Sequence, residues 1–137
     1  MASRLRPLTE NTPKCLLKVG EKCLLQRSID ALISNGIHDF VIVTGYLHEM
    51  IETFVAEQYG NSINVKFIHN AVFDSTNNIY SLWLARPEAE GQDILLLDSD
   101  LLYDPQIIAQ TLFITKSDSF YYKVVIEHTC DIGILGL

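Results

Sequence analysis

Cationic side chains gather near the start of the chain, in a segment that prolines keep irregular. These side chains are Arg4, Arg6, Lys14 and Lys18. Pro7 and Pro13 interrupt residues 3–19, so this segment cannot form one regular helix or a central strand. An α/β protein can use such a loop, placed at a strand end, to hold a phosphate-rich ligand.

The charge distribution supports an anion site in this region. Residues 1–27 carry six of the ten Lys and Arg residues and only two acidic residues, whereas the whole chain has a net charge of −7. A chain with this acidic balance has no broad basic face, which argues against general nucleic-acid binding. A small polyanion, held by one loop, is the expected ligand.

Two carboxylates follow the most apolar run of the chain. Asp98 and Asp100 come directly after residues 93–97, DILLL, which read as a buried strand. Parallel α/β sheets bind ligands at the carboxyl ends of their strands, and paired carboxylates suit a hard cation such as Mg²⁺. The alternative is that both are ordinary turn carboxylates.

Hydrophobic periodicity predicts alternating helices and strands over the rest of the chain. The expected helices cover about 24–35, about 50–59, a short segment after Asn77 and a segment opened by Asp104-Pro105; the expected strands are 40–44, 63–68, 93–97 and 121–126. This alternation predicts an α/β fold in which helices cover a parallel sheet. The tail 129–137 has no assigned element.

The N-terminal motif resembles a known family. Residues 3–9, SRLRPLT, followed by Pro13-Lys14, are similar to the signature loop of the sugar-phosphate and choline-phosphate nucleotidyltransferases. The resemblance implies a three-layer, Rossmann-like and mostly parallel sheet of the nucleotide-diphospho-sugar transferase type. In that family a strand and an Ala-Ala-Gly turn precede the loop, whereas here only Met1-Ala2 do. We therefore expect residues 1–137 to form a single partial nucleotidyltransferase domain, truncated at both ends and lacking the first strand.

The resemblance also assigns roles to individual residues. It implies that Arg4 contacts the β- and γ-phosphates, that Lys14 contacts the α-phosphate and the incoming phosphate, and that Ser3 helps to bind the nucleotide. Asp100 matches the family's metal aspartate, and Asp98 orients it or caps backbone, with Mg²⁺ as the implied cofactor. The family's second metal aspartate has no match in residues 113–137.

A second resemblance covers residues 77–82. Asn77-Asn78-Ile79-Tyr80-Ser81-Leu82 is similar to the NN-x-YSL segment of the choline-phosphate cytidylyltransferase branch. A helix N-terminus at Asn77 and Asn78 offers N–H groups and amide side chains to a nucleotide. Tyr80 and Trp83 fit either an aromatic cage for a quaternary ammonium or core packing, and their helical spacing favours core packing.

The missing first strand has a structural consequence. In the resembled fold it lies between the strands at 40–44 and 93–97, so its loss would leave unpaired N–H and C=O groups in the sheet. Residues 121–126 or a strand from a second copy are the preferred substitutes, and a chain that is not stably folded alone is the third possibility. A homodimer with strand exchange is therefore one expectation.

The leading functional hypothesis is transfer of a nucleotidyl group, with CTP as the favoured donor, to a phosphorylated small molecule such as phosphocholine or a sugar phosphate, releasing pyrophosphate. The alternatives are a nucleotide-sugar glycosyltransferase with an Asp-x-Asp metal site, or an inactive fragment that acts as a folded assembly module. The three cysteines form no Cys-x-x-Cys pair, and no apolar run reaches the ~18–20 residues that span a bilayer. We expect a cytoplasmic protein that binds neither membrane nor nucleic acid.

Overall fold

The structure is a computed structural model that describes residues 10–115 and 122–127. The helices are the 3-10 turn η2 (Lys14–Leu16), α1 (Leu24–Ser34), α2 (His48–Tyr59), α3 (Asn78–Ala89) and α4 (Gln106–Thr115). The strands are β1 (Lys18–Val19), β2 (Lys22–Cys23), β3 (Asp39–Thr44), β4 (Asn64–His69), β5 (Asp93–Asp98) and β6 (Tyr122–Glu127). The predicted elements are confirmed to within one or two residues at most of their ends. The N-terminal segment 3–19, which was expected to be a loop, contains the short elements η2 and β1.

Four parallel strands form the main sheet in the order β4-β3-β6-β5, and β1 pairs with β2 in a separate small antiparallel ladder. Phe40 on β3 lies opposite Val65 on β4 and Val124 on β6. Val124 in turn lies opposite Leu95 on β5. The register therefore brings the carboxyl ends of β3 and β5 to the same edge of the sheet.

Strand β6 occupies the central position between β3 and β5. It pairs with both neighbours in parallel. This is the place where the resembled fold has its first strand. Of the two preferred substitutes, the chain's own strand fills the gap, one residue later than the expected 121–126. The strand-exchanged homodimer is not required to complete this sheet and stays a prediction.

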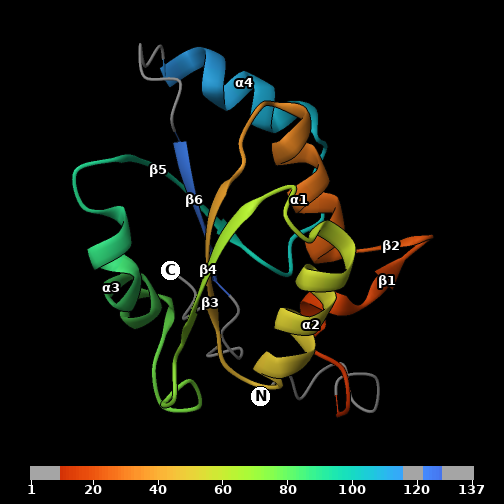
Figure 1. Cartoon of the computed structure of the whole chain (residues 1–137), viewed down its shortest axis with the longest axis vertical. Helices are drawn as coiled ribbons and strands as arrows, with labels where there is room; N and C mark the ends of the chain where they lie inside the picture. The colour runs from red at the N-terminus through yellow and green to blue at the C-terminus, as the bar shows by residue number, and fades with distance from the viewer. Residues whose placement is uncertain (1–9, 116–121, 128–137) are drawn as a thin grey trace, which may run out of the picture.

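The helices lie on both faces of the sheet, which confirms the three-layer α/β architecture. In Figure 1, α3 lies on one side of the strands and α1 and α2 lie on the other. The larger core is on the α1 and α2 side, where Phe40, Ile42 and Ile126 pack with Leu25 and Ile29. On the α3 side, a smaller cluster joins Val41 and Val43 to Ala85. β3 therefore contributes buried side chains to the cores on both faces of the sheet.

Helix α1 shows how local sequence sets the helix ends. The Cys23 thiol accepts a hydrogen bond from the Gln26 amide and caps the N-terminus. At the other end Gly36 adopts a φ of 80°, a left-handed conformation in which glycine has no Cβ penalty. Gly36 therefore ends this helix, which was expected over about 24–35.

Helix α3 buries a different face from the one that its apolar residues indicate. Ile79 and Trp83 are 75% and 59% exposed, whereas Ser81 and Ala85 are fully buried against the sheet. The prediction that Trp83 packs in the core is therefore wrong. Small side chains at Ser81 and Ala85 allow the helix backbone to approach β3, and this close approach turns the larger residues outward.

Strand β5 is partly uncovered on the α3 side. Ile94 and Leu96 point to that face and are 39% and 47% exposed, while Leu95 and Leu97 pack into the larger core. The most apolar strand of the sequence is thus buried on one face only within the described part of the chain. None of the described helices has the length and apolarity needed to cross a membrane.

Candidate active site

Lys14 from the cationic loop and Asp100 from the carboxylate pair meet at one place. The Lys14 Nζ atom lies 3.5 Å from an Asp100 carboxylate oxygen, although the two residues are far apart in the sequence. The Lys14 side chain is 15% exposed and that of Asp100 is 40% exposed, so the pair lies at the surface edge of the sheet. The expectation that these two residues converge is confirmed by this geometry.

The turn that carries Lys14 is fixed to the turn that carries Asp100. η2 is closed by hydrogen bonds from the Leu16 amide to the Pro13 carbonyl and from the Leu17 amide to the Lys14 carbonyl. Cys15 is fully buried and Ser99 is 3% exposed. Burial raises the pKa of the Cys15 thiol, while its contact with the Ser99 hydroxyl lowers it. The Cys15 and Ser99 side chains therefore join the two segments beneath Lys14 and Asp100.

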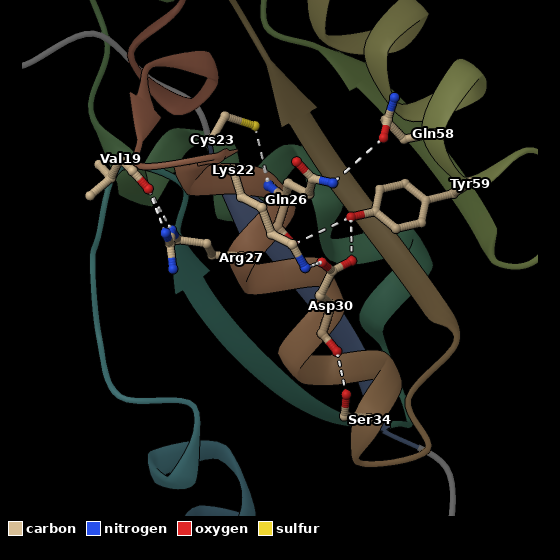
Figure 2. A network of polar contacts seen from close by, with 9 residues as sticks. All are labelled: Val19, Lys22, Cys23, Gln26, Arg27, Asp30, Ser34, Gln58 and Tyr59. Carbon is tan, nitrogen blue, oxygen red and sulfur yellow. Dashed lines mark hydrogen bonds and ion pairs between the residues drawn. The ribbon is translucent and has the colours of Figure 1, made fainter.

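The hairpin that follows η2 is tied to α1. Figure 2 shows the Arg27 side chain pointing from α1 to the Val19 carbonyl, to which both its Nε and one terminal nitrogen donate. Lys22 on β2 forms an ion pair of 2.6 Å with Asp30. The Tyr59 hydroxyl of α2 donates to the other Asp30 oxygen at 2.9 Å. The segment that begins at Lys14 is thus anchored to α1, and Tyr59 in turn ties α1 to α2.

Asp98 connects the carboxylate turn to the N-terminus of α3. Its carboxylate accepts a hydrogen bond of 3.2 Å from the Asn78 side-chain amide. Burial raises the pKa of Asp98, and the negative charge of Asp100 raises it further. The two carboxylates are therefore close enough to repel each other, so a cation placed between them would be stabilised.

Asn77 is the N-cap of α3, as predicted. Its side-chain oxygen accepts a hydrogen bond of 3.3 Å from the Tyr80 amide. The capping bond uses the side-chain oxygen, so Asn77 has a clear structural role. A part in nucleotide binding stays a prediction for both Asn77 and Asn78.

Asp98 and Asp100 are suitable Mg²⁺ ligands, and the described residues form no larger group of His, Cys, Asp or Glu that could hold a metal ion. Mg²⁺ is commonly bound through one or two carboxylates, with substrate phosphates and water completing its coordination. Burial and, to a smaller extent, the charge of Asp100 raise the pKa of Asp98, and a bound cation would oppose both effects by stabilising the charged carboxylate. The donor set therefore fits Mg²⁺ held jointly by this protein and a nucleotide.

Other predicted site residues lie outside this geometry. Ser3 and Arg4 fall outside residues 10–115 and 122–127, so their roles stay predictions from the sequence. The structure adds Tyr46, whose hydroxyl donates to the Glu10 carbonyl at 2.7 Å and so holds the N-terminal segment. Gly45 precedes it at a point where a Cβ atom would meet the Phe73 side chain at 2.7 Å. The sequence signal for this contact was a Gly-Tyr pair directly after β3.

This α/β fold, with its cationic loop facing a strand-end carboxylate pair, is that of an enzyme class that handles nucleotides. The chain belongs to the nucleotidyl transferase family, whose family model matches residues 1–128. It is 38% identical over 101 residues to the choline-phosphate cytidylyltransferase of Streptococcus pneumoniae. It is also 30% identical over 107 residues to the CTP:phosphoglutamine cytidylyltransferase of Campylobacter jejuni.

A solved structure of a cytidylyltransferase is also similar to this chain. The CTP:phosphocholine cytidylyltransferase structure from Streptococcus pneumoniae matches with a TM-score of 0.56 and 42% sequence identity, over 64% of this chain and 36% of that one. The two sequence matches cover 74% of this chain in each case, and 42% and 40% of the respective relatives. The chain therefore spans less than half the length of these relatives.

Proposed function

We propose that this chain provides the nucleotide-handling part of a cytidylyltransferase. The reaction would transfer a cytidylyl group from CTP to a phosphorylated small molecule and release pyrophosphate. The observation that carries this proposal is the Lys14–Asp100 pair, which joins the signature loop to the carboxylate turn at 3.5 Å. The similarity to two cytidylyltransferases supports CTP as the donor.

In nucleotidyl transfer the protein mainly has to neutralise charge and align the two substrates. A phosphate oxygen of the acceptor attacks the α-phosphorus of CTP, a new P–O bond forms, and the bond to the β-phosphate breaks with release of pyrophosphate. Because the acceptor brings its own nucleophile, catalysis depends on holding the two phosphates in line and stabilising the added negative charge. In this proposal Lys14 would neutralise charge at the α-phosphate.

The carboxylates would have a complementary role. Mg²⁺, when bound, would supply positive charge to the nucleotide oxygens, and Asp98 and Asp100 are the residues that would hold it. Asp100 is paired with Lys14. A bound triphosphate and Mg²⁺ would replace this ion pair with separate contacts to the two side chains. Asn78, through its bond to Asp98, would keep that carboxylate oriented.

A pyrophosphate-release assay tests the proposal. Incubation with CTP, phosphocholine and Mg²⁺ is expected to release pyrophosphate, and Lys14→Met should lower kcat/KM by about 100-fold, as expected for loss of one preorganised charge contact. Lys66→Met is the matched control, because Lys66 forms a surface ion pair with Glu88. This variant should keep the activity of the unmodified chain.

Other outcomes of the same assay would favour the alternative functions. Sugar transfer from a nucleotide sugar, without pyrophosphate release from CTP, would support a glycosyltransferase. A folded chain that binds no CTP would support an assembly module. Activity that is equal in Lys14→Met and in the unmodified chain would contradict the proposed role of the signature loop.

Two further properties are part of the proposal. A cytoplasmic location agrees with the free, buried thiols of Cys15 and Cys23, which suit a reducing compartment. A second copy could supply β6 in place of the chain's own strand, giving the strand-exchanged homodimer. Light scattering after size exclusion decides this point, because a monomer at all concentrations leaves only the intrachain strand.

A further inference from the structure

A fully buried asparagine follows strand β4. Asn70 comes directly after the last residue of that strand and is 0% exposed. Its backbone amide donates a hydrogen bond of 2.8 Å to the carbonyl of Thr44, at the end of β3. A polar side chain is stable at this depth only when its hydrogen bonds are satisfied. The partners of the Asn70 side chain therefore indicate what it holds in place.

The Asn70 side chain bonds to both ends of the segment that leads into α3, and to α3 itself. Its oxygen accepts a hydrogen bond of 3.1 Å from the Val72 amide. Its nitrogen donates to the Thr76 hydroxyl at 3.0 Å and to the buried Ser81 hydroxyl at 3.4 Å. The Thr76 hydroxyl in turn donates to the Val72 carbonyl at 2.8 Å. The amide therefore uses its oxygen and both N–H groups on this segment and this helix.

The segment held by Asn70 ends where α3 contacts the carboxylate turn. Asn78 is the first residue of α3, and its side-chain nitrogen donates to the Asp98 carboxylate at 3.2 Å. Thr76 precedes Asn78 by two residues and Ser81 follows it by three. The backbone on either side of Asn78 is thus bonded to one buried amide. The position of Asn78 relative to Asp98 therefore depends on Asn70.

We propose that Asn70 is a positioning residue for the carboxylate turn, because it fixes the N-terminus of α3 so that Asn78 holds Asp98 in one orientation. A buried polar group with all its hydrogen bonds made selects one arrangement of its neighbours, which an apolar side chain of the same size would not do. This placement depends on neither nucleotide nor metal. Its catalytic consequence rests on the proposed function, since an oriented Asp98 would bind Mg²⁺ more tightly in the presence of CTP.

Hydrogen exchange measured by NMR on the full chain, without nucleotide or metal, tests the positioning. The reporter is the side-chain amide of Asn78, which loses protection when its bond to Asp98 opens. We expect this amide to exchange about fivefold faster in Asn70→Ala and in Thr76→Val, because each variant removes hydrogen bonds that hold the α3 N-terminus. Thr76→Ser keeps the hydroxyl and should exchange at the rate of the unmodified chain.

A matched variant separates positioning from a general loss of stability. Val55 is 1% exposed in the core on the other face of the sheet, so Val55→Ala should lower the melting temperature but leave the exchange of the Asn78 amide unchanged. If Asn70→Ala does not fold, Thr76→Val decides the question. Unchanged Asn78 exchange in Thr76→Val, or an equal increase in Val55→Ala, would overturn the proposal.

Calorimetry with CTP tests the consequence for the metal site. Thr76→Val should weaken CTP binding about tenfold in Mg²⁺ and leave it unchanged in EDTA, because only the metal-dependent part requires an oriented Asp98. A general loss of stability would weaken binding in both conditions. Faster Asn78 exchange with unchanged CTP affinity in Mg²⁺ would support the positioning of Asn78 and overturn its link to the metal. Faster Asn78 exchange in variants of a chain that binds no CTP would support the role of Asn70 and contradict the proposed function.

Discussion

The two faces of the sheet differ sharply in how they are packed. On the α1 and α2 face, Phe40, Leu25 and Ile29 are at most 1% exposed and form one large core. On the α3 face, Ala85 packs closely on β3, but Trp83 and Leu96 stay about half exposed. The difference teaches that the stability of the described fold comes mainly from the first face, which also supports the turns that carry Lys14 and Asp100.

The largest effect should come from paired aromatic substitutions on the two faces. Phe40→Ala removes a fully buried ring and should lower the free energy of unfolding by about 3–5 kcal/mol. Trp83→Ala removes a larger ring that is 59% exposed and should cost only about 1 kcal/mol. Denaturant titration of both variants measures this contrast, and equal losses would show that the two faces contribute equally.

A second pair of substitutions tests which side of α3 is buried. Ser81→Leu would force a larger side chain between α3 and β3 and should destabilise the fold by about 1–3 kcal/mol. Ile79→Ala, on the exposed side, should change the free energy of unfolding by no more than about 0.5 kcal/mol. If the Ile79 variant were the less stable one, the Ile79 side of α3 would be the buried side, which would contradict the burial of Ser81.

The cap of α3 should have a smaller effect. Asn77→Ala removes the acceptor for the Tyr80 amide and should destabilise the protein by about 1 kcal/mol, as for other N-cap losses. Asn77→Asp keeps a capping oxygen and should retain most of this stability. Thermal unfolding of the two variants measures the difference, and indistinguishable melting temperatures would remove the capping role.

The smallest effect concerns pH. Because the pKa of Asp98 is raised in the folded protein, the folded state holds its proton more tightly, and stability falls as the pH rises from the ordinary carboxyl pKa to the raised value. Asp98→Asn removes this cost and should make the protein slightly more stable at neutral pH, with no gain below pH 3.8. A variant that loses stability at neutral pH and keeps it in acid would reverse the sign of this account.

Local signals in the sequence were sufficient for most of the fold. The i, i+4 spacing of Leu25 and Ile29 and the stop at Gly36 gave α1, and the β-branched run around Ile42 gave β3. The need to satisfy hydrogen bonds in a gapped sheet made the strand ending at Ile126 one of two preferred candidates for the centre, beside a strand from a second copy. These predictions succeeded because each depends on short-range periodicity or on a general requirement for backbone pairing.

Other features depend on three-dimensional packing and could not be predicted in this way. Trp83 reads as a core residue by hydrophobicity, but the close approach allowed by Ser81 turns it outward. The contact of Cys15 with Ser99 joins two segments whose separation in the sequence gives no signal. The motif resemblance placed Lys14 and Asp100 at one site.

The central claim is that Lys14 and Asp100 act on the same nucleotide, and a double-mutant cycle of CTP binding tests it most directly. Calorimetry with CTP and Mg²⁺ would compare the unmodified chain with Lys14→Met, Asp100→Asn and the double variant. We predict that each single change weakens binding about tenfold or more, and that the combined effect differs from their product because the residues are 3.5 Å apart. Unchanged CTP affinity in either single variant would contradict the account.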